Sequence, residues 1–225
     1  MNLRERFRRW RDFTAKTMAG MSFRQKLAYL LYYYKGWILG LLLLVMLGAY
    51  IGDAVFQSQK EIILQGFFTN DEYGLFDAEE IQKEYTEIRA PKEKQIIIFD
   101  DDLYIDLGGE TTEYTAASNG KLIAYMAVQE LDFVVTSGEV FLHYEGQAPM
   151  MDFRELLPED MLKRLEDQLL GSGLEAGTGP CLALDMSRSR FGSGDGESYY
   201  MFVPLLAPHP QEICDFIRWC FPELF

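Results

Sequence analysis

The feature that most restricts this chain is an uncharged apolar run, GWILGLLLLVMLGAYIG, between Gly36 and Gly52. An AVF triplet extends the run past Asp53. A helix of roughly 20 residues, rising about 1.5 Å per residue, crosses the hydrocarbon core of a bilayer. The run therefore predicts a transmembrane helix over residues 36–56, and a buried core helix is the alternative.

The charge differs strongly on the two sides of this run. Residues 1–35 carry nine Lys or Arg against two acidic residues, a net charge of +7, whereas the whole chain carries −14. Basic segments beside a span stay in the cytoplasm, so we expect segment 1–35 to be cytoplasmic and residues 57–225 to form an extracellular domain. A helix that starts at Ser22 should continue into the membrane. The expected partner of the basic segment is the anionic inner leaflet, and not nucleic acid.

Aromatic residues stand at both ends of the run, where a bilayer meets water. The predicted inner interface holds Tyr32, Tyr33, Tyr34, Lys35 and Trp37, and the outer one holds Tyr50. Tyr and Trp favour these interfaces, so the pattern supports a single-pass protein of the cell membrane. Gly52-Asp53-Ala54 has the spacing of a signal-peptidase site, but the basic segment is longer than that of a signal peptide. An uncleaved anchor is therefore favoured.

Strand and helix patterns alternate beyond the apolar run. The strand patterns are EIILQGFFT (61–69), KQIIIFD (94–100) and LDFVVT (131–136), and helical patterns at 77–88 and about 115–129 separate them. Parallel neighbours need such crossover connections, and runs of Ile and Val are typical of strands buried on both faces. The sequence predicts an α/β fold with an open, mainly parallel sheet and helices on both faces. We expect the first strand to lie between the other two.

Later patterns predict a helix over residues 158–170, a two-stranded ribbon and a final helix. The ribbon strands are CLALDMS (181–187) and YYMFVPLLA (199–207), in an orientation that can be antiparallel to the main sheet. In HPQEICDFIRWCF (209–221), Pro210 suits the first helical turn. Its apolar stripe consists of Ile213, Phe216, Ile217 and Cys220.

Three of these stretches also carry a family resemblance. They are QELDFVV (129–135), MDFRELL (151–157) and YYMFVPLLAPHPQEICDFIRWCF (199–221). They resemble parts of type II periplasmic-type solute-binding proteins. The stretch 129–135 resembles the entry to a strand of those proteins, 151–157 resembles a later run, and 199–221 resembles their returning strand and final helix. YYYKGW (32–37) is similar to the membrane entry of single-span envelope proteins of Firmicutes. The resemblance implies a membrane-anchored, solute-binding-like domain.

The chain departs from that family in size. Only about 60 residues separate the third predicted strand from the returning strand at Tyr199, which leaves no room for a second lobe of comparable size. We therefore expect one solute-binding-protein-like lobe. A single lobe offers an open shelf instead of a closing pocket, which favours a weakly held ligand or a protein partner.

The predicted topology selects the candidate ligand-binding residues, because ligands of open α/β sheets bind beyond the carboxyl ends of the strands. Those ends place Asn70, Asp71, Asp100, Ser137 and Gly138 in the candidate site. Ser137 with Gly138 can present backbone N–H groups at a helix start, or Ser137 can simply cap that helix. The Asp100–Asp102 run lacks the spacing of a calcium loop, so a solvated acidic turn is favoured. We expect no metal site.

Nothing in the sequence selects a catalytic centre, so we expect no enzyme and no cofactor. The chain has two histidines, His143 and His209, and lacks a nucleophile elbow, a phosphate loop and a metal-binding His pair. The three cysteines, Cys181, Cys214 and Cys220, are expected to be small buried hydrophobes.

Two functions remain open. The first is a non-catalytic binding module that senses or presents a small ligand at the cell surface. The second is an envelope scaffold that docks another protein and has no small ligand. A polar cleft rimmed by aromatics such as Tyr73, Tyr104 or Tyr144 favours the first, and an exposed apolar patch favours the second.

Overall fold

The structure is a computed structural model that describes residues 5, 8, 20–57, 60–109, 112–177, 179–192 and 198–225. The chain divides into two compact units, Met1–Gln59 and Lys60–Phe225.

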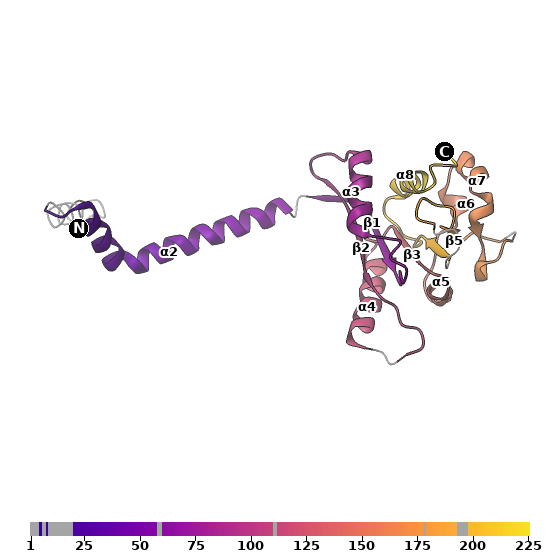
Figure 1. Ribbon diagram of the computed structural model, residues 1–225, viewed down its shortest axis with the longest axis horizontal. Helices are drawn as coiled ribbons and strands as arrows, with labels where there is room; N and C mark the ends of the chain where they lie inside the picture. The colour runs from indigo at the N-terminus through magenta and orange to yellow at the C-terminus, as the bar shows by residue number, and fades with distance from the viewer. Residues whose placement is uncertain are drawn as a thin grey trace. The chain divides into compact units, whose positions relative to one another are not determined.

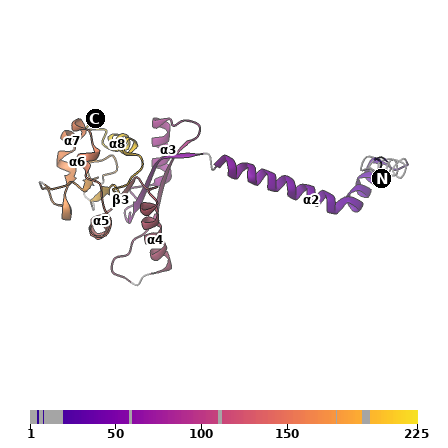
Figure 2. The same cartoon turned by 180° about the vertical axis from the view of Figure 1, so that it is seen from behind.

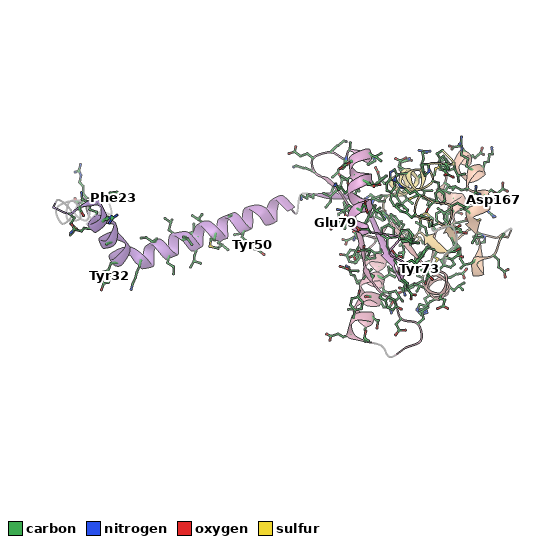
Figure 3. The ribbon with its side chains drawn as sticks, in the orientation of Figure 1. Phe23, Tyr32, Tyr50, Tyr73, Glu79 and Asp167 are labelled. Atoms are coloured by element: carbon green, nitrogen blue, oxygen red, sulfur yellow. The ribbon has the colours of Figure 1, made fainter. Side chains whose placement is uncertain are left out.

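The described part of the first unit includes the long helix α2 (Phe23–Gln57), which begins directly after Ser22 as predicted. Figure 3 shows the labelled side chains of Phe23, Tyr32 and Tyr50 along this helix, where each is more than 70% exposed. The Lys35 ammonium lies 5.9 Å from the centroid of the Tyr32 ring. The side chains of three predicted interface residues, Tyr33, Tyr34 and Trp37, lie outside the described residues, as does most of segment 1–19.

Within the described part of the chain, no helix combines the length and the apolar character that a membrane crossing requires. The predicted single span over residues 36–56 thus receives no support from the structure.

The second unit is built on a mixed six-stranded sheet with the order β2-β1-β3-β6-β5-β4. Its strands are β1 (Glu61–Thr69), β2 (Gln95–Leu103), β3 (Phe133–Ser137), β4 (Leu169–Leu170), β5 (Ala183–Asp185) and β6 (Tyr199–Phe202). β1 pairs in parallel with both β2 and β3, which confirms the predicted parallel core and its order. β6 pairs antiparallel with β3 and β5, so the ribbon joins the main sheet.

Helices cover both faces of this sheet, as predicted. They are α3 (Ala78–Arg89), α4 (Glu113–Ala127), α5 (Gly138–Glu145), α6 (Phe153–Leu156), α7 (Glu159–Arg164) and α8 (Pro210–Cys220), with 3₁₀ turns at Glu166–Gln168 and Ser172–Leu174. In both Figure 1 and Figure 2, α3, α6, α7 and α8 lie above the strands and α4 and α5 lie below. The chain therefore forms a three-layer α/β domain.

Alternation along the strands creates a separate core on each face. Phe68 and Phe133 belong to the cluster that contains α3, α7 and α8, whereas Phe67 and Val134 belong to the cluster that contains α4 and α5. Successive side chains of a strand point to opposite faces, so β1 and β3 supply both clusters. The predicted stripe of the last helix, Ile213, Phe216, Ile217 and Cys220, is fully buried in the first cluster.

The predicted helix over residues 158–170 is wrong in its second half. α7 ends at Arg164, and Leu169 and Leu170 instead pair with Leu184 and Ala183 of β5. Sheet pairing and burial there outweigh the helical pattern, because tertiary contacts routinely override local propensity. Met161 and Leu165 have no exposed surface.

Candidate functional site

A pocket of about 460 Å³ lies beyond the carboxyl ends of the parallel strands. Its lining comes from the segments that follow β1 and β2, from the start of α5 and from the start of β6: Asn70, Glu72, Tyr104, Ile105, Asp106, Leu107, Gly108, Ser137, Gly138, Glu139, Val140, Ser198 and Tyr200. Three of the five predicted ligand-binding residues, Asn70, Ser137 and Gly138, are in this lining. The volume is within the range of small-molecule sites.

Asn70 shapes the pocket wall. Its backbone has a φ of 55°, in the left-handed region that Asn tolerates better than most residues. Its side-chain amide donates to the Ile105 carbonyl oxygen at 2.7 Å, and its Oδ1 accepts the Ile105 N–H at 2.8 Å. Asn70 thereby ties the segment after β1 to the segment after β2. This role makes Asn70 a structural residue of the site as well as a lining one.

Ser137 and Gly138 form the floor where β3 becomes α5. Ser137 occupies the N-cap position of α5, but its side chain makes no capping hydrogen bond. The structure thus places Ser137 at the predicted N-cap position without a side-chain cap bond, and the half-buried residue belongs to the pocket lining. A Cβ at Gly138 would come within 3.2 Å of both Leu174 and the Tyr200 ring, so glycine lets these side chains pack against the helix start.

Asp71 and Asp100 do not line the pocket. One carboxylate oxygen of Asp71 accepts the Phe76 N–H at 2.6 Å, which fixes the loop after β1. Asp100 forms an ion pair with Lys121 of α4. Both carboxylates thus hold neighbouring elements in place.

The acidic run Asp100–Asp102 lies inside β2, which continues to Leu103 instead of ending at residue 100 as predicted, and it is also used inside the fold. Asp101 accepts the Ala78 N–H at the start of α3, at 2.9 Å. Among the described residues, no three His, Cys, Asp or Glu side chains are arranged to hold a metal ion.

Three carboxylates that the sequence reasoning missed line the pocket: Glu72, Asp106 and Glu139. Asp106 Oδ1 accepts the N–H groups of Gly108 and Gly109 at 3.1 and 2.9 Å, and these bonds lower the pKa of its carboxyl. The signal was present in the sequence, because Asp106 precedes a Gly-Gly turn and Glu139 follows a strand-to-helix junction. The segments 70–77, 104–112, 137–142 and 192–200 contain no Lys or Arg.

Of the tyrosines predicted to rim a polar cleft, only Tyr104 lines the pocket, together with Tyr200 of β6. Tyr73, labelled in Figure 3, is 58% exposed and is not part of the lining. Tyr144 is buried, and its hydroxyl donates to Asn119 Oδ1 at 2.5 Å. Burial raises the pKa of the Tyr144 phenol to about 12.

Neither histidine lines the pocket. His143 is on α5, where its ring contacts the Gln147 amide at 3.1 Å. His209 precedes α8, and its Nδ1 lies 3.0 Å from Asp132, a carboxylate with no exposed surface at the opposite end of β3 from the pocket. The His209 side chain makes no cap bond to α8 and packs on Asp132. The three cysteines are buried and unbonded to one another, as expected.

A second, apolar groove of about 320 Å³ lies between α4, the end of α5 and the segment after β6. Its lining is Ile123, Met126, Ala127, Tyr144, Gln147, Ala148, Pro149, Pro204, Leu205 and Leu206. Ile123, Leu205 and Leu206 are each more than 45% exposed. An exposed apolar patch was the feature expected of a docking scaffold.

Comparisons with models of known protein families, with curated proteins and with solved structures found no match to this chain. The resemblance to one lobe of a solute-binding protein therefore stays a prediction.

Proposed function

We propose that this chain is a membrane-anchored, non-catalytic module that binds a small polar ligand at the cell surface. The observation that carries the proposal is the pocket at the strand ends, which joins Asn70, Ser137 and Gly138 from separate strand termini. Such a position beyond the carboxyl ends of parallel strands is where open α/β sheets bind ligands. The pocket is open to solvent on one side, as expected for a single lobe, so its affinity should be modest.

The membrane part of the proposal rests on the sequence, on the basic segment and on the apolar run that α2 contains. Ten of its large apolar side chains are at least 40% exposed in the helix: Ile38, Leu39, Leu41, Leu42, Leu43, Leu44, Val45, Met46, Leu47 and Ile51. In water, this exposure would forgo roughly 1.5–3 kcal/mol for each side chain of this size. A lipid environment removes that cost, and the basic segment places the N-terminus in the cytoplasm.

Cysteine labelling on intact cells tests this topology. Both Ser172 and Ser22 are exposed, and the native cysteines are buried. We expect a Ser172→Cys variant to react with an impermeant thiol reagent, and a Ser22→Cys variant to react only after the cells are opened. Labelling of both variants on sealed cells would contradict a membrane crossing, and the reverse pattern would invert the topology.

A thermal-shift screen of the full-length chain in detergent tests the pocket. Ligands that bind the native state raise its unfolding temperature. We expect at least one polar small molecule to stabilise the chain, and a Leu107→Trp variant, which fills the lining, to lose the shift. Leu142→Trp is the matched control, because Leu142 is exposed to a similar extent on α5 but does not line the pocket.

The hydrogen bonds in the structure also decide which alanine variant is informative. Ser137→Ala should weaken binding and leave the fold intact, because the hydroxyl caps nothing. Asn70→Ala removes two bonds to Ile105, so its effects would mix binding with the shape of the wall.

The scaffold function is the second candidate, and the apolar groove around Ile123 and Leu205 favours it. It predicts the opposite result in the same screen. No compound would give a shift that Leu107→Trp abolishes, and an Ile123→Glu variant would lose crosslinks to an envelope protein in cells. A pocket-dependent shift together with unchanged crosslinks would reject the scaffold.

A further inference from the structure

We propose that the ligand of the strand-end pocket is a small organic cation, such as an aliphatic amine. This inference rests on the proposed function and specifies its ligand. It begins from the half-open pocket of about 460 Å³, whose lining includes the exposed residues Glu72, Asp106 and Glu139.

The charge of the lining is one-sided. Glu72, Asp106 and Glu139 each come from a different segment around the pocket. None of the lining residues is basic, and the four segments that supply the lining contain no Lys or Arg. Some acidic side chains outside this region have cationic partners, as Asp100 has Lys121 and Glu212 has Arg89. A ligand cation would supply here the countercharge that the lining lacks.

An anion at the start of α5 is the competing ligand class. Helix N-termini attract anions, and Ser137 could add a hydroxyl donor. However, Glu139 lies in the first turn of α5 and already presents a negative charge to the same N–H groups. An anionic ligand would face this carboxylate and two more without a basic side chain to offset them. At about 4 Å, each like-charge contact costs on the order of 1 kcal/mol even in water.

A metal ion is disfavoured by the spacing of the acidic groups. Within the described residues, these carboxylates do not form a group that could hold one. A metal ion also leaves most of the pocket volume empty, whereas a flexible amine can contact carboxylates on separate walls. Asp106 is held as the ionised partner of such a cation, because two backbone N–H groups bind its other lone pairs.

Aromatic side chains in the lining support an organic cation. Tyr104 is 40% exposed at the pocket, and Tyr200 reaches it from β6. Ring faces attract ammonium groups and also cover the methylene chain between them. The Tyr199 hydroxyl accepts a hydrogen bond from the Glu72 N–H at 3.1 Å. This bond fixes the backbone at Glu72, which carries one of the three pocket carboxylates.

Three probes with the same five-carbon chain test the ligand charge. Calorimetry on the full-length chain in detergent would compare 1,5-diaminopentane, 1,5-pentanediol and glutarate, with calcium chloride as a fourth probe. We expect only the diamine to bind, with a dissociation constant of roughly 10 μM to 1 mM for a half-open site. Raising the salt concentration should weaken this binding several-fold.

Charge-neutralising variants locate the binding. Glu139→Gln and Glu72→Gln should each weaken the diamine about three- to tenfold. Asp160→Asn is the control, because Asp160 is an exposed residue of α7 outside the pocket lining. Equal weakening by Asp160→Asn, or binding that Leu107→Trp leaves unchanged, would show a general effect of the acidic surface and overturn the inference.

Failure of the inference can be separated from failure of the proposed function. Equal or tighter binding of the diol, of glutarate or of calcium would overturn the choice of an organic cation. Absence of diamine binding would overturn it as well. In each of these cases the thermal-shift screen still tests the proposed function by itself. A neutral or anionic compound whose shift is lost in Leu107→Trp would establish a small-ligand site.

Discussion

A Gly66→Ala variant is expected to lose about 3 kcal/mol or more of unfolding free energy, enough to leave little folded α/β domain. A Cβ built at Gly66 in the middle of β1 would lie 2.1 Å from Cζ of Phe133 and within 2.6 Å of both neighbouring ring carbons. The ring itself cannot withdraw. It has no exposed surface and stacks on Phe216 with the ring centroids 4.7 Å apart.

The α4 helix offers a matched control. Gly120 is exposed there, and a Cβ added to it would meet nothing within 4 Å. Alanine in a helix interior is more favourable than glycine by about 0.5–1 kcal/mol, so Gly120→Ala should stabilise the chain by that amount. Urea unfolding of the full-length chain measures both changes. Equal effects of the two variants would contradict the close approach of Phe133 to β1.

A double variant identifies the clash as the cause. Phe133→Leu removes the atoms that the new Cβ would meet, at its own cost of a large-to-small core change. The double variant Gly66→Ala/Phe133→Leu should therefore be less destabilised than the sum of the two single variants. Additive losses would place the strain of Gly66→Ala elsewhere.

Local patterns were enough to predict the central part of the fold. Ile- and Val-rich runs separated by helices predicted the parallel pairing of β2, β1 and β3, because parallel strands need crossovers and two covered faces. The stripe of α8 was predicted for the same kind of reason, since a 3.6-residue period defines one face. The end of α7 was not predicted. Residues 169 and 170 pair with β5 instead of continuing the helix, and β5 lies more than ten residues further along the chain.

The candidate site shows the same division. Topology alone placed Asn70, Ser137 and Gly138 at one end of the sheet, and the structure brings them into one pocket. Topology could not decide which carboxylates face the pocket, because that depends on partners distant in sequence. Asp100 forms an ion pair with Lys121 of α4, whereas Glu139, which follows the strand-to-helix junction, lines the pocket.

The contact between Asp132 and His209 was not predicted either, because the two residues are far apart in the sequence. A substitution at Asp132 has the second of the two largest expected effects on stability. Asp132→Ala should cost about 3–5 kcal/mol of unfolding free energy. The carboxylate is fully buried and accepts the Gln65 N–H at 2.7 Å, the His209 N–H at 2.9 Å and the His209 ring at 3.0 Å. Its removal leaves two backbone donors without acceptors, each at about 1–3 kcal/mol. His209→Ala retains both backbone bonds and should cost roughly half as much, so an equal loss would assign the effect to the ring.

The pH dependence of an Asp132→Asn variant tests the charge of this group separately from its hydrogen bonds. Burial raises the pKa of the Asp132 carboxyl, and the bonds from His209 and Gln65 offset part of the rise. A raised pKa means that the folded chain binds this proton more readily than the unfolded chain, whose carboxyl has a pKa near 4. The stability that Asp132 contributes is therefore complete below about pH 4 and declines as the pH rises through the folded-state pKa.

Asn carries no such titration, so the loss of unfolding free energy in Asp132→Asn relative to the native chain should be largest near pH 4 and smaller at pH 7. Urea unfolding at the two pH values measures this difference, and a deficit that grows toward pH 7 would mean that the hydrogen bonds to the carboxylate outweigh its desolvation.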